Sequence, residues 1–187
     1  MKKYIWPSIK LTAILIVLLI GIYPLIILGI AKLVPGGGKG ISIEKNGKTI
    51  GYENIAQKFT QPGYFWPRPS AVNYNAAGSG GSNKSPYNPD YVKSTKALLD
   101  SFLKYNPDIK KEDVPAEMIT ASGSGLDPDI TVQGAEVQLP RVARARNISK
   151  DKIETLIKEQ TEKPWLGMFG IERINVLKLN VALDELK

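Results

Sequence analysis

A single mixed α+β domain behind one membrane-spanning helix is expected from three features of this 187-residue chain. An uncharged apolar run lies near the N-terminus, hairpin and helix patterns follow it without a regular βαβ rhythm, and no internal repeat occurs. The length that remains after the apolar run suits one domain with a real core.

The apolar run covers residues 11–30 and is bracketed by Lys10 and Lys32. Twenty helical residues span about 30 Å, the hydrocarbon thickness of a bilayer. The run exceeds the 7–15 residues that are usual for a signal peptide, so a retained anchor is favoured over a cleaved signal. We expect residues 1–33 to be a membrane anchor with a short cytoplasmic tail.

The orientation of this anchor follows weakly from charge. Lysines flank both ends of the run in nearly equal number, but the basic tail ahead of it favours a cytoplasmic N-terminus. The C-terminal domain is then extracytoplasmic.

The composition excludes several classes of function. The chain carries 25 Lys plus Arg against 18 Asp plus Glu, and residues 1–32 hold four of those lysines without an acid. Little positive charge is left for the domain, which argues against nucleic-acid binding. Because the chain has no Cys and no His, thiol chemistry, Ser-His-Asp catalysis and His-ligated zinc are excluded. A non-catalytic protein without a metal site is favoured.

We expect residues 34–40 to be a Gly-rich spacer and residues 41–187 to form the domain. Residues 41–52 predict a hairpin, because Asn46-Gly47 is the type I′ turn pair between β-branched residues. Residues 53–60 are a short helix candidate. Asn88-Pro89-Asp90 begins a helix that reaches Tyr105.

Further elements are expected in the C-terminal half. Residues 114–121 predict a strand, and residues 130–146 a helix interrupted by Pro140. Ser149 caps a helix to about Gln160. Residues 173–179 predict a strand, after which Asn180 caps the last short helix.

The segment 62–90 predicts a long loop, since 17 of its 29 residues are Gly, Pro, Ser or Asn. It nevertheless contains five aromatic residues, which need burial or a partner. We interpret it as an ordered functional loop that contacts another protein. The alternative is a loop whose rings only pin it to its own domain. The aromatic residues are Tyr64, Phe65, Trp66, Tyr74 and Tyr87.

Three weaker patterns admit chemistry, each with a structural alternative. Ser122-Gly123-Ser124-Gly125 is either a phosphate cradle or a Gly-rich turn. Asp127 and Asp129 are either a carboxylate pair for acid–base or cation chemistry or, more simply, helix caps. Arg141 and Arg144 share a helix face at this spacing and either bind a phosphate or a partner's acids or form a solvated face.

The order of motifs along the whole chain resembles the KdpC family of the potassium-transporting Kdp ATPase complex. The matching stretches are Tyr23-Pro24-Leu25, residues 61–70 (QPGYFWPRPS), residues 79–83 (SGGSN), Asn88-Pro89, residues 114–127 (VPAEMITASGSGLD), residues 138–146 (QLPRVARAR) and residues 174–184 (INVLKLNVALD).

This resemblance implies an accessory subunit of a complex in the bacterial inner membrane that imports potassium at the expense of ATP. The implied partners are a channel-like potassium-translocating subunit, a P-type ATPase subunit and a small helical subunit, together with the lipid bilayer. No cofactor is expected to bind tightly. ATP is a possible ligand by resemblance alone, because the family is described as raising the ATP affinity of the ATPase subunit.

Two groups of candidate residues follow. The expected partner contacts are Tyr64, Phe65, Trp66, Arg68, Gly81, Ser82, Asn83, Tyr87 and Asn88. The weak phosphate or nucleotide candidates are Ser122, Gly123, Ser124, Gly125, Arg141 and Arg144. Two alternative functions stay open: an anchored extracytoplasmic hydrolase that uses Asp127 and Asp129, and a ligand-binding module.

Overall fold

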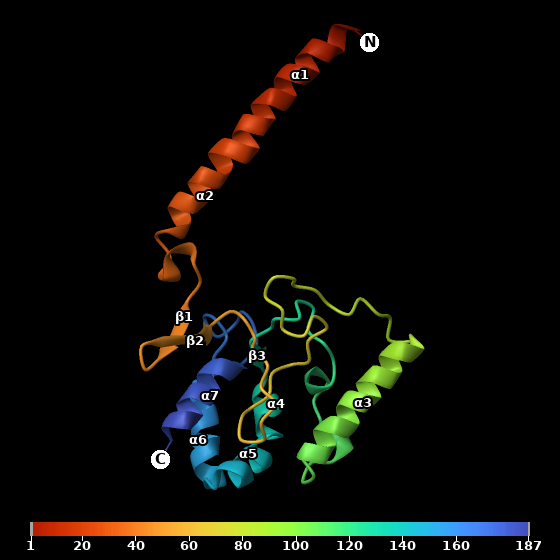
Figure 1. The fold of residues 1–187 in the computed structure, drawn as a ribbon, viewed down its shortest axis with the longest axis vertical. Helices are drawn as coiled ribbons and strands as arrows, with labels where there is room; N and C mark the ends of the chain where they lie inside the picture. The colour runs from red at the N-terminus through yellow and green to blue at the C-terminus, as the bar shows by residue number, and fades with distance from the viewer. Residues whose placement is uncertain (1, 187) are drawn as a thin grey trace. The chain divides into compact units, whose positions relative to one another are not determined.

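The computed structural model describes residues 2–186 and divides into two compact units, with the boundary after Ser42 (Figure 1). The first unit is a long helix with a short turn behind it, and the second is a mixed helix and strand domain. The α+β class expected from the sequence is confirmed.

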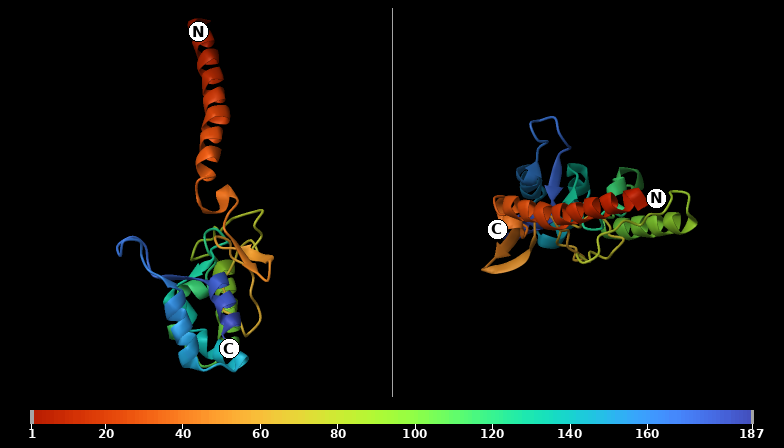
Figure 2. Two further views of the ribbon diagram at one scale, coloured as in Figure 1. Left: turned by 90° about the vertical axis from the view of Figure 1, so that its left-hand side faces the viewer. Right: turned by 90° about the horizontal axis from the view of Figure 1, so that it is seen from above.

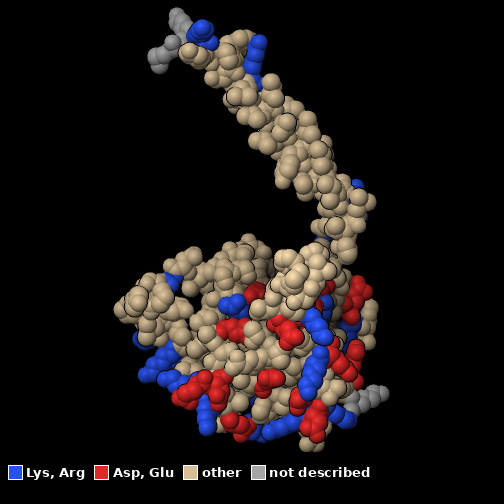
Figure 3. Space-filling view, turned by 180° about the vertical axis from the view of Figure 1, so that it is seen from behind, with Lys and Arg blue, Asp and Glu red and all other residues tan. Residues whose placement is uncertain are grey.

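The N-terminal unit is one continuous helix made of α1 (Lys2–Ile16), the π-helical segment η1 (Val17–Ile22) and α2 (Tyr23–Ala31). Its residues 3–31 are long and apolar enough to cross a bilayer, and the helix fits a single-pass membrane anchor. In Figure 3 its surface is free of charged side chains between the two ends. A 3₁₀ turn, η2 (Pro35–Gly38), follows.

The π-helical segment has a local cause in the sequence. Pro24 has no N–H, and its ring would clash with the carbonyl group four residues earlier in a regular α-helix. The helix widens ahead of it, so that the Tyr23 N–H bonds to the carbonyl of Leu18, five residues back. The helix therefore passes Pro24 without ending.

The second unit contains two small antiparallel sheets. β1 (Ser42–Lys45) pairs with β2 (Lys48–Tyr52), and the turn between them has positive φ at both Asn46 (53°) and Gly47 (72°), which confirms the type I′ hairpin. The other sheet has the order β3-β5-β4. Its strands are β3 (Asp129–Ile130), β4 (Thr161–Glu162) and β5 (Arg173–Asn175).

Five helices accompany these sheets in the described part of the domain: α3 (Pro89–Tyr105), α4 (Val132–Glu136), α5 (Leu139–Arg146), α6 (Lys150–Gln160) and α7 (Val176–Glu185). The core lies between α5, α6, α7 and β5, where Val142, Ile153, Ile174 and Leu179 are all completely buried. Figure 1 shows α3 on the opposite side of the domain from α6 and α7.

Two predicted helix starts are confirmed. The side chain of Asn88 accepts hydrogen bonds from the N–H groups of Asp90 and Tyr91, and Pro89 is the first residue of α3. Ser149 occupies the cap position of α6, although its side chain makes no capping hydrogen bond.

Two predicted elements are wrong. Residues 53–60 form a turn followed by irregular chain rather than a helix. Residues 114–121 form no strand: the 3₁₀ turn η4 (Ala116–Met118) lies there instead, shortly after another 3₁₀ turn, η3 (Lys111–Asp113). Pro115 limits strand formation because it lacks the N–H that a ladder requires, and it caps η4.

The expected helix over residues 130–146 is divided. Thr131 caps α4 by accepting a hydrogen bond from the Gly134 N–H, so the cap is neither Asp127 nor Asp129. Pro140 does not interrupt a helix but lies in the first turn of α5, where its missing N–H leaves no bond unmade.

The predicted strand over residues 173–179 ends early, at Asn175. The Asn175 side chain accepts a hydrogen bond from the Lys178 N–H and begins α7. Asn180 therefore lies inside α7 and is not its cap. It is buried, which assigns it a different role.

Candidate partner interface

The aromatic motif at residues 64–66 lies against the core rather than outside it. Phe65 is completely buried, and its N–H and C=O bond to the side-chain amide of Asn180 at 2.8 and 2.9 Å. Trp66 bonds in the same way to Gln138, the residue that precedes α5, at 2.8 and 3.1 Å. Two side-chain amides thus take the place of a neighbouring strand.

Arg141 of α5 extends this arrangement. Its guanidinium lies 4.1 Å from the centre of the Trp66 ring and donates to the carbonyl groups of Pro62 and Tyr64 and to the Gln138 side chain. Its Nε donates to Asn106. Burial lowers the pKa of Arg141 to about 10. The side chain is 3% exposed, so it binds its own loop and not an external phosphate.

A second arginine clamps the start of the loop. Arg146 donates to the carbonyl of Gly63 at 2.7 Å, stacks on Tyr64 at 4.4 Å and pairs with Asp184 of α7 at 2.6 Å. Asp184 also pairs with Lys45 at 2.8 Å. Burial raises the pKa of Asp184, but the hydrogen bonds from Lys45 and Arg146 outweigh it, and the net pKa is lowered.

The Gly-rich turn at residues 122–125 forms hydrogen bonds with the middle of the loop, and we call this contact the latch. Ser122 is buried, its N–H donates to Pro69, and its hydroxyl accepts from the Gly125 N–H. The carbonyl of Ser124 accepts from the N–H of Gly80 at 2.8 Å. Two of the amides expected to cradle a phosphate, those of Ser122 and Gly125, are therefore used inside the domain.

Two glycines allow the close packing of this turn against the loop. Gly125 has φ of +69°, and a Cβ there would lie 2.8 Å from the carbonyl oxygen of Gly80. A Cβ on Gly81 would lie 3.0 Å from the carbonyl oxygen of Gly123. Gly81 thus serves close packing against the turn.

Arg68 belongs to the same internal framework. It pairs with Asp127 at 3.0 Å, and its backbone carbonyl accepts a hydrogen bond from the Tyr74 hydroxyl at 2.9 Å. Burial raises the pKa of Tyr74 to about 12. Pinning by rings, the alternative interpretation of the loop, therefore describes residues 64–74.

The remainder of the loop is exposed at residues 75–79 and again at residues 82–87. Ser82, Asn83 and Tyr87 are exposed, Tyr87 by 93%, and Asn88 is half-buried at the start of α3. A groove of about 360 Å³ lies between this segment and α3. It is lined mainly by Pro69, Tyr74, Ser82, Lys84, Tyr91 and Leu98.

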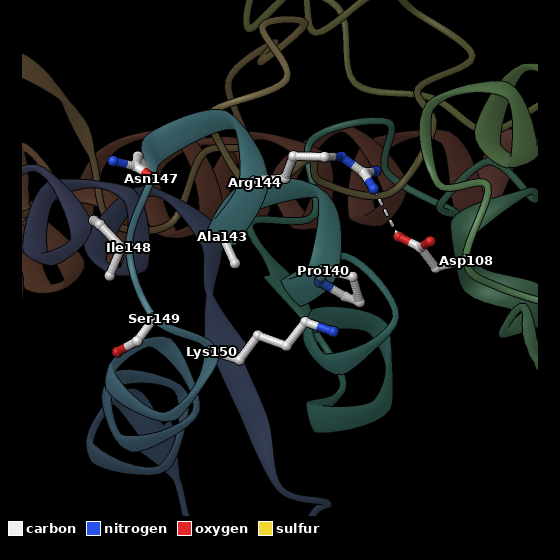
Figure 4. Close-up of a pocket in the computed structure, with 8 residues that line it drawn as sticks. All are labelled: Asp108, Pro140, Ala143, Arg144, Asn147, Ile148, Ser149 and Lys150. Atoms are coloured by element: carbon white, nitrogen blue, oxygen red, sulfur yellow. Dashed lines mark hydrogen bonds and ion pairs between the residues drawn. The ribbon is translucent and has the colours of Figure 1, made fainter.

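Arg144 lies elsewhere. It pairs with Asp108 at 3.0 Å over a shallow basin of about 500 Å³ that Lys150 and Ser149 also line, and Figure 4 shows this ion pair. Arg144 is exposed whereas Arg141 is buried, so the two arginines do not form the shared face that their spacing predicted.

The two aspartates considered for hydrolysis are engaged in structure. Asp127 pairs with Arg68 and accepts from the Asp129 N–H at 3.1 Å. Asp129 lies 3.4 Å from Arg173, and burial raises its pKa. Among residues 2–186, no group of three or more Asp or Glu side chains is positioned to hold a metal ion.

The polar side chains that hold the loop were not predicted from the sequence. Asn106, Gln138 and Asn180 are buried and bond to residues 35 to 115 positions away. Their signal was weak: each is an amide within an otherwise apolar helical face or helix end, which local periodicity counts as a mismatch.

These features define a class of protein: an α+β domain on a single apolar helix, with an aromatic loop whose residues 64–74 pack against the domain and whose residues 82–87 are exposed. Comparison with known proteins specifies the family. The family model for the c chain of the K⁺-transporting ATPase, KdpC, matches residues 5–185.

Similar proteins named as the KdpC subunit of the potassium-transporting ATPase occur in several bacteria. The protein of Flavobacterium psychrophilum is 52% identical over 185 residues, which cover 99% of this chain and 100% of the relative. The Bacteroides fragilis protein is 46% identical over 188 residues (99% and 98%), and that of Caldanaerobacter subterraneus 42% over 186 residues (99% and 96%). The chain belongs to the KdpC family. It is an accessory subunit of the K⁺-transporting ATPase complex, with no catalytic function indicated for it.

Proposed function

We propose that this subunit stabilises the potassium import complex by presenting residues 82–88 and the groove beside α3 to the channel-like, potassium-translocating subunit. The observation that carries the proposal is the division of the aromatic loop. Residues 64–74 are bonded to their own domain, whereas Tyr87 is 93% exposed.

The rigid half of the loop supports the exposed half. A contact segment that is ordered before binding loses less conformational entropy when the complex forms. The bonds to Gln138, Asn180 and Ser124 hold the loop on both sides of residue 75. A large exposed tyrosine is also a residue type enriched among interface hot spots.

We also propose the remaining partners and the location, with the family and the charge pattern as support. The complex contains a P-type ATPase subunit and a small helical subunit, and it lies in the cell inner membrane. The basic tail at Lys2, Lys3 and Lys10 supports a cytoplasmic N-terminus and an extracytoplasmic domain.

The experiment compares Tyr87→Ala with Trp66→Ala in the full chain. For Tyr87→Ala we expect normal thermal stability and a complex affinity lower by on the order of 2 kcal/mol. Trp66 packs edge-on against Tyr105 at 5.0 Å and under Arg141, so its replacement lowers the melting temperature and leaves the affinity of the folded chain unchanged. Normal assembly of the Tyr87 variant would refute the proposed surface.

Raised ATP affinity of the ATPase subunit is a separate proposal that rests on the family alone. One way to raise that affinity would be for this chain itself to bind ATP at residues 122–125. Bound ATP would then protect the backbone amides of that turn from hydrogen exchange. The amides of Ser122, Gly125 and Leu126 already bond within the domain, so we expect no such protection.

A further inference from the structure

The loop between β4 and β5 carries an apolar tip that no part of the domain covers. Within residues 164–171 five large side chains are exposed: Trp165 by 71%, Leu166 by 68%, Met168 by 75%, Phe169 by 58% and Ile171 by 68%. Both views of Figure 2 show this blue segment extending away from the rest of the domain. Single exposed apolar residues are ordinary, but five in one short loop mark a binding surface.

Four of the seven backbone N–H groups of this loop bond within it. Trp165 and Phe169 form a bridge, in which the Trp165 N–H donates to the Phe169 carbonyl at 2.9 Å and the Phe169 N–H to the Trp165 carbonyl at 3.0 Å. The N–H groups of Gly167 and Met168 donate to Pro164 and Trp165. Backbone groups that bond within the loop need no other partner at a lipid surface, and the headgroup region contains water for the N–H groups of Leu166, Gly170 and Ile171.

The composition of the side chains in this loop also favours a lipid environment. From Pro164 to Ile171 no side chain is charged, and the indole N–H of Trp165 is the single side-chain donor. Protein interfaces carry many hydrogen bonds and a polar rim, which this tip cannot supply. A Trp ring with one polar edge, beside Lys163, suits the level of the lipid headgroups.

The short linker between α2 and β1 keeps the domain close to the bilayer. Ten residues separate Ala31, the end of α2, from Ser42, the start of β1. Fully extended, ten residues span at most about 35 Å, so the domain is confined near the membrane that the helix enters. Confinement of this kind raises the effective concentration of a second binding site.

We propose that residues 164–171 insert into the headgroup region of the bilayer and anchor the domain at a second point. The occupant of the apolar tip is the lipid surface, not a protein. This inference goes beyond the proposed function, since it concerns a different segment from residues 82–88 and requires no partner subunit.

The absence of cysteine from the chain permits a direct depth measurement. Met168→Cys and Tyr87→Cys are each made in the full chain, labelled with a nitroxide and reconstituted alone in vesicles of phosphatidylethanolamine and phosphatidylglycerol. Oxygen concentrates in lipid and a nickel chelate stays in water, so the ratio of their collision rates reports depth. Tyr87→Cys is the matched control, because Tyr87 is also highly exposed.

We expect the oxygen-to-nickel ratio at position 168 to be several-fold higher than at position 87. The added replacement of Trp165 and Phe169 by Ser should bring it down to the control value. Equal ratios at both positions would overturn the proposal. So would a high ratio that needs the partner subunits, which would indicate a protein interface, or one that rises with protein density in the vesicles, which would indicate a second copy of the chain.

Discussion

Arg141 shows how a single residue organises this domain. It is buried, and its described partners are two carbonyl groups, two side-chain amides and the face of Trp66, with no carboxylate among them. Guanidinium suits this site because five donors lie in one plane, which the ammonium of Lys does not reproduce.

Replacement of Arg141 by Met should therefore destabilise the domain strongly. The change leaves the buried acceptor of Asn106 and the partly buried carbonyl bonds of Pro62 and Tyr64 without donors, and the expected loss is about 3–5 kcal/mol. Urea denaturation measures it. Arg144→Ala is the control, since the exposed pair with Asp108 contributes about 0–1 kcal/mol. Similar losses for both variants would contradict the structural role of Arg141.

Asp184 predicts a pH dependence whose sign is determined by its lowered pKa. A carboxyl group with a pKa below its unfolded value stabilises the folded state above that unfolded value, near 4, and the contribution disappears as the pH falls through the folded pKa. Asp184→Asn should thus be less stable than the native chain at neutral pH, because Lys45 and Arg146 lose their charged partner.

The measurement is the free energy of unfolding of both proteins between pH 7 and pH 3. The difference between them should narrow as the pH falls below about 5. A difference that stays constant over this range would show that the Asp184 charge does not contribute through these ion pairs.

At the level of the elements, the latch between residues 79–81 and 122–125 depends on backbone geometry. Gly125→Ala introduces a Cβ 2.5 Å from Val72 at a positive φ, whereas Gly123 has no atom within 4 Å of the added Cβ. We expect Gly125→Ala to lose about 2–4 kcal/mol of stability from overpacking and strain.

Gly123→Ala serves as the matched control, with an expected change within about 0.5 kcal/mol. Hydrogen exchange of the Gly80 N–H, which bonds to Ser124, reports the latch itself. Unchanged protection of Gly80 in the Gly125 variant would mean that the latch tolerates the added methyl group.

The whole molecule divides into an anchor and a domain with its own core. All buried residues of the core cluster lie between Phe65 and Leu183. Removal of residues 1–33 should therefore leave a soluble, monomeric domain that unfolds cooperatively. Its association with the complex should weaken sharply, because packing of the membrane helix is lost.

Thermal unfolding and co-purification with the complex test this pair of expectations. Aggregation of the truncated chain would show that the domain needs its helix to fold. Association as tight as that of the full chain would show that the helix is only a tether.

A C-terminal fusion tests the orientation. We expect an alkaline phosphatase fused after residue 187 to be active and a cytoplasmic reporter at the same position to be silent, because the basic N-terminal tail favours a cytoplasmic N-terminus. The opposite pattern would place the domain in the cytoplasm.

Local chemistry in the sequence was enough to predict the apolar anchor, the Asn46-Gly47 hairpin and the start of α3, since each depends on neighbouring residues. Turn geometry, helix capping and the length of an apolar run are properties of a few consecutive positions.

Only the tertiary structure decided which face each loop residue presents. Phe65 and Trp66 turn inward because side chains more than 70 positions away, Asn180 and Gln138, supply their hydrogen bonds. Asn180 serves Phe65 rather than a cap for the same reason, whereas the strand expected over residues 114–121 is prevented locally by Pro115. Such contacts depend on how distant segments meet, and no local period in the sequence records that meeting.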